Sequence, residues 1–183
     1  MKLVSLDGKN VMYWDHNPTD EWKEVSFKIL QDIFQENPDA FPLTVVMPIK
    51  DKVGVFPIPF EDEEEKIHRL GVISTMLQVV KAEWYVIASE CWFVMRKIEE
   101  VDDSIRPSQC DDRKECLMVL KVDKKGVDSS VLFEITRDNG ITTFTENKNL
   151  RFGSGRLSEL FDAEISQDAL IEMKRHMKEN GIL

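Results

Sequence analysis

One carboxylate stands in the most apolar part of this chain, where its chemistry depends on its neighbours. Glu90 lies in the run from Trp84 to Met95, and strand alternation places it on one face with tryptophan and valine side chains. A carboxylate in such surroundings either pairs with a cation or has its pKa raised by burial. A carboxylate with a raised pKa is suited to act as a general acid or base, whereas a carboxylate in an ion pair more often stabilises the structure.

Two arginines in the following connection are candidate partners of Glu90. Arg106 and Arg113 belong to RPSQCDDRKE, residues 106–115, which is rich in turn-forming residues. The planar guanidinium group suits bidentate pairing with a carboxylate. We therefore expect Glu90 to be largely buried and to pair with Arg113 or Arg106, which would tie this connection to a core strand. If the protein is an enzyme, these three residues are its candidate catalytic set.

A second candidate site lies in RFGSGR, residues 151–156, just before a predicted helix. Backbone N–H groups at a helix start, together with Arg151, Ser154 and Arg156, suit the binding of an anion. The same Gly-Ser-Gly sequence is equally typical of a flexible loop in which Ser154 caps the helix. Both interpretations remain open at this point.

The histidines and cysteines do not have the spacing of metal ligands. They are His16, His68 and His176, and Cys91, Cys110 and Cys116. The cysteines are odd in number and form no CxxC pair, so we expect no disulfide scaffold. We also expect no bound transition metal and no cofactor, since none of the common nucleotide, phosphate, zinc or serine-hydrolase motifs is present.

The first third of the chain predicts a hairpin, a helix and an edge strand. Asp7-Gly8 between two apolar runs predicts a hairpin over residues 2–14. Apolar residues at helical spacing predict a helix that ends at Asn37-Pro38. A second hairpin follows, and its strand at residues 53–60 carries Pro57 and Pro59. Because both prolines lack an N–H on the same side, we expect this strand to lie at a sheet edge.

A helix is predicted over residues 61–81. Its acidic start, EDEEE, places negative charge where the helix dipole favours it. We expect Gly71 to allow a close approach of this helix to a sheet. The residues expected on its core face are Ile67, Leu70, Ser74 and Leu77.

The remaining chain predicts four strands and two helices, at residues 83–97, 114–123, 130–137, 141–146, 155–161 and 166–180. The first of these strands is apolar on both faces, which is typical of a central strand covered on both sides. Asn139-Gly140 predicts a tight turn between the last two strands. Strands joined by hairpins, with few helices between them, indicate an α+β fold: a mainly antiparallel sheet with helices packed on it.

Length and composition indicate one globular domain spanning residues 1–183. The chain has 42% hydrophobic and 32% charged residues, which excludes a disordered composition. A net charge of −10 disfavours nucleic acid and anionic membranes as partners. The start lacks the apolar core of a signal peptide, and the run 84–95 is too short to span a bilayer. We expect a soluble, cytoplasmic protein.

Three short motifs carry a resemblance to known proteins. SECW at 89–92, RPS at 106–108 and DRKE at 112–115 together resemble a segment of small uncharacterised microbial and phage proteins. The resemblance covers residues 84–122. It implies no activity, and it implies that Glu90, Trp92, Arg106 and Arg113 belong to one structural unit.

Three functions are compatible with these patterns. The first is a non-enzymatic binding or accessory protein that acts through protein–protein contacts, including self-association, with exposed tryptophans as anchors. The second is an enzyme of an unrecognised type that uses Glu90 with Arg106 or Arg113. The third is a phage-type inhibitor that mimics nucleic acid, although lysine and arginine interrupt its carboxylates. The absence of a catalytic motif favours the first.

Overall fold

The computed structural model describes residues 2–6, 9–14, 26, 30, 42–50, 52–94, 109–138, 141–147 and 156–183. Only the backbone is described for residues 2–14, 52, 141, 142, 144 and 156. The helix predicted to end at Asn37 lies outside these residues except for Ser26 and Leu30. Both are helical and buried.

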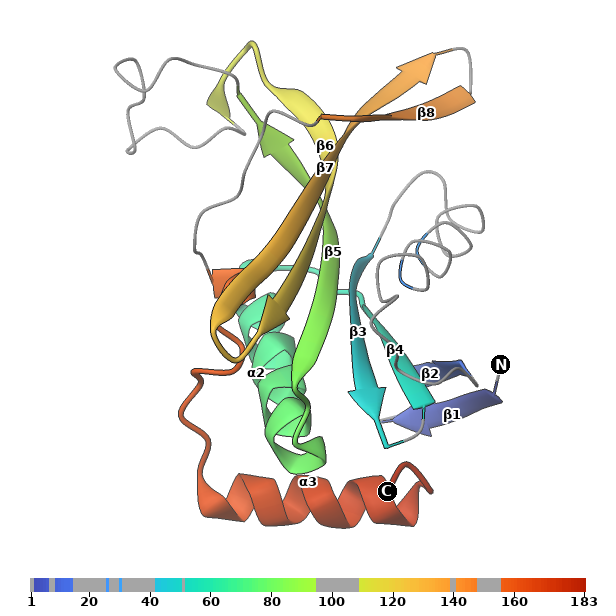
Figure 1. Cartoon of the computed structure of the whole chain (residues 1–183), viewed down its shortest axis with the longest axis vertical. Helices are drawn as coiled ribbons and strands as arrows, with labels where there is room; N and C mark the ends of the chain where they lie inside the picture. Colours follow the sequence, from blue (N-terminus) through green and yellow to red (C-terminus); the bar gives the residue numbers. More distant parts are fainter. Residues whose placement is uncertain are drawn as a thin grey trace.

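The described strands form one antiparallel sheet of eight strands in the order β1-β2-β4-β3-β5-β6-β7-β8 (Figure 1). Their bounds are β1 Lys2–Leu6, β2 Lys9–Trp14, β3 Leu43–Ile49, β4 Lys52–Ile58, β5 Trp84–Phe93, β6 Lys114–Asp123, β7 Gly126–Asp138 and β8 Ile141–Glu146. Helices pack on this sheet, so the predicted α+β class is confirmed.

Two hairpins form where short turn sequences predicted them, and a third has a glycine at its turn. Leu6 pairs with Lys9 across Asp7-Gly8, and Asp138 pairs with Ile141 across Asn139-Gly140. At the third turn, Gly126 has a φ of 118°, a conformation that glycine adopts without the steric cost of a Cβ atom. Each of these turns fixes the register of the two strands that it joins.

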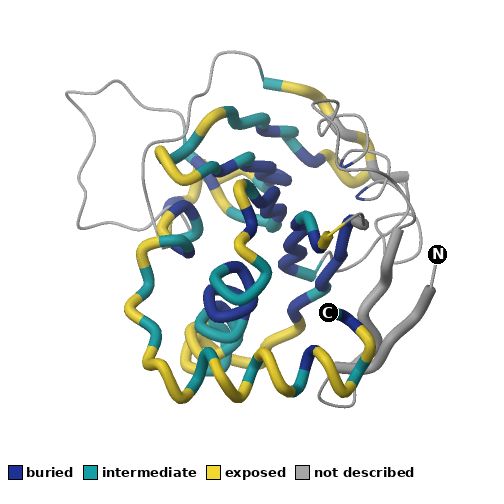
Figure 2. The backbone as a smooth tube through the Cα atoms, turned by 60° about the horizontal axis from the view of Figure 1, so that its bottom comes forward, coloured by how far each residue is buried: buried dark blue, intermediate teal, exposed yellow. Residues whose placement is uncertain are grey.

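The two described α-helices each begin after a capping residue. α2 spans Glu63–Val80, and its N-cap Asp62 accepts a hydrogen bond of 2.8 Å from the backbone N–H of Glu65. α3 spans Gln167–Glu179, starts after the N-cap Ser166 and is followed by Gly181 at a φ of 68°. Figure 2 shows that α3 is exposed along most of its length and buried near its C-terminal end. No helix in the described part of the chain is long and apolar enough to cross a membrane.

β5 lies between β3 and β6 and is covered on both faces over its first half. Tyr85 and Ile87 belong to the core cluster that α2 and α3 close. Val86 and Ala88 belong to a second cluster on the opposite face, together with Leu30. The prediction of a central strand covered on both sides is therefore confirmed for residues 85–88 and is wrong for Ser89 to Trp92, which are partly or fully exposed.

Tyr85 also ties the segment before α3 to the sheet. Its hydroxyl donates a hydrogen bond of 2.8 Å to the carbonyl oxygen of Leu157, in the 3-10 helix η3 (Arg156–Ser158), and its ring lies 5.1 Å from that of Phe161. Burial raises the pKa of the Tyr85 hydroxyl above its ordinary range. The hydroxyl thus stays protonated and remains a donor.

The prediction that residues 53–60 form an edge strand is wrong. β4 pairs with β3 along its whole length and also with β2, through Val53, Gly54 and Val55. Beyond Val55, β4 pairs only with β3 among the described strands. The pairing with β2 thus ends before Pro57, and the two prolines do not place β4 at the edge of the sheet.

Two expectations for α2 are also wrong. Ile67 is 48% exposed, although Leu70, Ser74 and Leu77 are buried as expected. A Cβ atom on Gly71 would meet nothing within 4 Å, so this glycine does not mediate a close approach to the sheet. A tight contact instead surrounds Gly54 of β4, where a Cβ would lie 2.7 Å from Ile49 Cδ1 and 2.7 Å from the Phe56 ring.

The two glycines make a matched pair of substitutions. Gly54→Ala should destabilise the fold by about 1–3 kcal/mol, because the buried Phe56 ring must move. Gly71→Ala should stabilise it by about 0.5–1 kcal/mol, because alanine favours the helix and meets no neighbour. Urea denaturation of both variants measures the difference. Equal midpoints for Gly54→Ala and the parent protein would contradict this packing.

Candidate functional site

The second half of β5 extends past the cover of the helices. Figure 1 shows that the ends of β5, β6 and β7 opposite α3 continue beyond α2. Along β5 the residues from Tyr85 to Ala88 are buried, whereas Ser89 to Trp92 are partly or fully exposed. Polar side chains and a tryptophan can therefore occupy this end without loss of core packing.

Five side chains from three strands and one turn gather on one face of this end. Register pairs Trp92 of β5 with Glu115 of β6, so both point to the same side as Glu90. Arg113 precedes β6, and Arg137 lies near the end of β7. We refer to Glu90, Trp92, Arg113, Glu115 and Arg137 as the Trp92 face.

Arg137 joins the two carboxylates of this face. Its Nη2 lies 3.2 Å from Glu90 Oε1 and 3.0 Å from Glu115 Oε1, and its Nε donates to Glu115 Oε2 at 3.2 Å. The pairing with Glu115 is bidentate, the arrangement that fixes a guanidinium most firmly. The three side chains are 22–32% exposed, so solvent screens them only partly.

Arg113 covers Trp92 from the turn before β6. Its Cζ lies 5.0 Å from the centre of the Trp92 ring, which is the geometry of a cation–π contact. Its Nη1 also donates a hydrogen bond of 3.2 Å to the carbonyl oxygen of Cys110. Trp92 still remains 45% exposed. The result is a large apolar ring held in place at the surface.

The prediction that Glu90 pairs with an arginine is confirmed, but the arginine found is not one of the two predicted. The Glu90 side chain is 22% exposed, and among the described residues the cation beside it is Arg137. Pairing with Arg113 is wrong, because that guanidinium contacts Trp92 and Cys110. Arg106 lies outside the described residues. Arg137 was missed because it is 47 positions from Glu90, and the registers of β5 against β6 and of β6 against β7 together bring it there.

The anion site predicted at residues 151–156 stays a prediction. Arg151 and Ser154 lie outside the described residues. Arg156 begins η3, and only its backbone is described.

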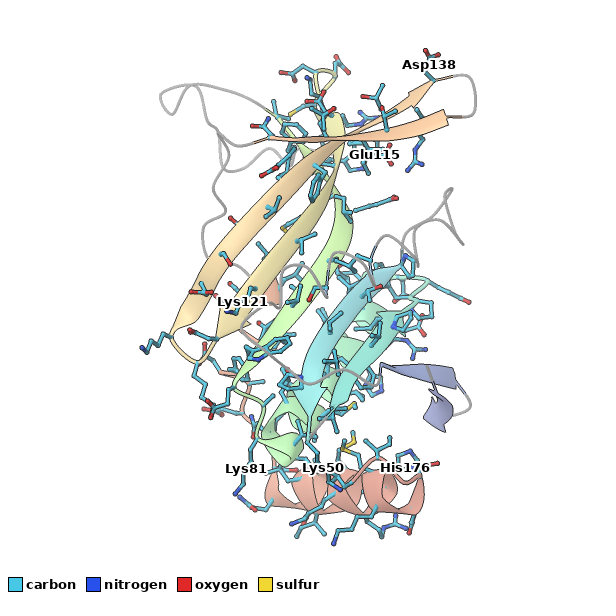
Figure 3. All side chains as sticks on the ribbon, turned by 45° about the vertical axis from the view of Figure 1, so that its right-hand side comes forward. Lys50, Lys81, Glu115, Lys121, Asp138 and His176 are labelled. Atoms are coloured by element: carbon cyan, nitrogen blue, oxygen red, sulfur yellow. The ribbon has the colours of Figure 1, made fainter. Side chains whose placement is uncertain are left out.

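A groove between α2 and α3 lies at the other end of the molecule. Its volume is about 720 Å³, and its lining includes Ile67, His68, Glu172 and His176. Figure 3 shows His176 on α3 at one end of the molecule and Glu115 at the opposite end. Among the described residues, no group of three or more His, Cys, Asp or Glu side chains is placed to hold a metal ion. The groove thus offers a mixed apolar and polar surface.

Comparison with protein-family models, with curated proteins and with solved structures found no match to this chain. Its function is therefore inferred from the geometry of the described residues.

The ion pairs of the Trp92 face predict a measurable stability effect. Arg137→Ala should lower the free energy of unfolding by about 1–2 kcal/mol, because Glu90 and Glu115 then lose the cation between them. Arg175→Ala is the matched control. Arg175 pairs with Glu179 at 3.2 Å on α3, but these side chains are 64% and 56% exposed. That change should cost at most about 0.5 kcal/mol.

Urea denaturation at low and high salt separates the two variants. High salt should reduce the difference in the free energy of unfolding between the parent protein and Arg137→Ala only slightly. The reason is that the ion pairs of Arg137 are partly shielded from solvent. An equal decrease in the free energy of unfolding for Arg137→Ala and Arg175→Ala would show that the ion pairs of Arg137 stabilise the fold no more than an exposed ion pair on a helix.

Proposed function

We propose that this protein is a non-enzymatic binding protein that docks a partner protein through the Trp92 face. The observation that carries the proposal is a tryptophan left 45% exposed beneath an arginine guanidinium. Tryptophan and arginine are the residues most enriched among those that dominate binding energy at protein interfaces. A cytoplasmic location, as expected from the sequence, belongs to the same proposal.

The Trp92 face is organised before any partner arrives. Arg113 rests on the Trp92 ring, and Arg137 holds Glu90 and Glu115 at 3.2 and 3.0 Å. Side chains that already occupy one arrangement lose less conformational entropy on binding. This fixed arrangement of the side chains supports a role in binding a partner.

The charge around Trp92 favours a basic partner segment. On the Trp92 face itself, Glu90 and Glu115 balance Arg113 and Arg137 in charge. Counted over both faces of this end of the sheet, residues 111–115, residues 134–138 and Glu90 carry six carboxylates and three cationic side chains. The whole chain has a net charge of −10. A partner segment with arginine or lysine beside an apolar side chain would complement both the ring and the surrounding charge.

The ion pairs favour binding over the two alternative functions. A general base needs a carboxylate that can accept a proton from a substrate, whereas Glu90 accepts a hydrogen bond from Arg137. A mimic of nucleic acid needs a row of uncompensated negative charges, whereas Arg137 lies between Glu90 and Glu115. Both observations support a mixed-charge binding surface.

Selection from a random peptide library tests the proposal directly. Peptides are selected on the immobilised full chain, and the selected peptides are synthesised and titrated by fluorescence anisotropy. We expect basic peptides with an apolar residue. Trp92→Ala should weaken their binding roughly thirtyfold, which corresponds to the loss of about 2 kcal/mol at a dominant contact.

Ile171→Ala is the matched control for this test. Ile171 is also a large exposed apolar residue, 65% exposed, but it lies on α3. The control variant should bind the selected peptides like the parent protein. Selection of acidic peptides, or unchanged binding by Trp92→Ala, would overturn the proposal.

A further inference from the structure

Two of the three cysteines face each other across neighbouring strands. Cys91 of β5 and Cys116 of β6 are directly paired in the sheet register. Their sulfur atoms lie 3.2 Å apart and share a hydrogen bond, and both cysteines are free thiols in this structure. They lie on the face of the sheet opposite Trp92, since neighbouring residues of a strand point to opposite sides.

The backbone at this position already suits a disulfide bond. Directly opposed residues in antiparallel strands have Cα atoms about 4.5–5.5 Å apart. Disulfide-bonded cysteines have Cα atoms about 4.4–6.8 Å apart. A bond between Cys91 and Cys116 therefore needs rotation of two side chains and no rearrangement of the strands.

The two thiols differ in access and in acidity. Cys91 is partly exposed, whereas Cys116 is fully buried beside Phe93 and Leu132. The hydrogen bond from Cys116 and the charge of Lys66 on α2 lower the pKa of Cys91 against the opposing effect of burial. The same hydrogen bond and burial raise the pKa of Cys116. Cys91 is thus the thiol that an oxidant in solution meets first.

We propose that Cys91 and Cys116 form an oxidation-sensitive dithiol site that a small hydroperoxide converts to a disulfide. The proposal rests on the paired register, the sulfur distance and the unequal exposure of the two residues. It is independent of partner binding at the Trp92 face.

The reaction balances in two steps. The Cys91 thiolate attacks one oxygen of hydrogen peroxide; an S–O bond forms, the O–O bond breaks, and hydroxide leaves and takes up the proton that Cys91 lost. The Cys91 sulfur is oxidised by two electrons, and the peroxide is reduced. The Cys116 sulfur then attacks the Cys91 sulfenic acid; an S–S bond forms, the S–O bond breaks, and the hydroxyl leaves as water with the Cys116 proton. Two thiols and one peroxide give one disulfide and two waters.

The test uses the untagged full chain, reduced, desalted and treated with hydrogen peroxide. Free thiols, counted after denaturation, should fall from the three of the parent chain to one. The intact mass should fall by about 2 Da, for two hydrogens. A peptide map without reduction should show a cross-link between Cys91 and Cys116, and a reducing agent should restore all three thiols.

Cys110 is the internal control, since it is buried and lies in the turn before β6, outside the paired strands. Cys110→Ser should still form the cross-link. Cys116→Ser should instead retain a sulfenic acid at Cys91 that a dimedone probe labels. If this variant does not fold, the peptide maps of the parent chain and of Cys110→Ser decide the question. Three persistent thiols in the parent chain, or a cross-link that includes Cys110, would overturn the proposal.

Discussion

The structure depends on the first half of β5, where one strand is paired on both sides and buried on both faces. β3 pairs with Val86, Ile87 and Ala88, and β6 pairs with the whole of β5. Helix α2 closes one face, and the cluster that includes Leu30 closes the other. Burial of this kind requires apolar side chains at consecutive positions, which explains the absence of charge from Tyr85 to Ala88.

The second half of β5 is free of that requirement, and both proposed sites lie there. Beyond Ala88 the strand pairs only with β6 among the described strands. Cys91 and Trp92 are consecutive, so they point to opposite faces of the same strand pair. The proposed partner binding at Trp92 and the proposed oxidation at Cys91 would thus use opposite faces of the same strand pair.

Local signals in the sequence predict most of the elements. Asp7-Gly8 and Asn139-Gly140 mark hairpins because tight turns need residues that tolerate their backbone angles. The acidic run before Lys66 marks a helix start because the helix dipole favours negative charge beside the unpaired N–H groups of the first turn. Each of these effects acts over a few residues, which is why the sequence alone reveals it.

Contacts between distant segments could not be predicted in the same way. β2 pairs with β4 although residues 15–42 and β3 separate them in sequence, and the prolines of β4 suggested an edge. Arg137 reaches Glu90 only through the register of two successive strand pairs. The pairing of Cys91 with Cys116 has a usable signal, because antiparallel alignment of two ten-residue strands places them opposite each other.

Native-state hydrogen exchange tests the role of β5 most directly. The amides of Val86, Ile87 and Ala88 should be among the slowest to exchange, because two neighbouring strands and two packed layers protect them. Their exchange should require global unfolding of the protein. The amides from Cys91 to Phe93 should exchange at least about tenfold faster, through local opening of the sheet end. Exchange at residues 86–88 as fast as in β8, which pairs only with β7 among the described strands, would contradict this account.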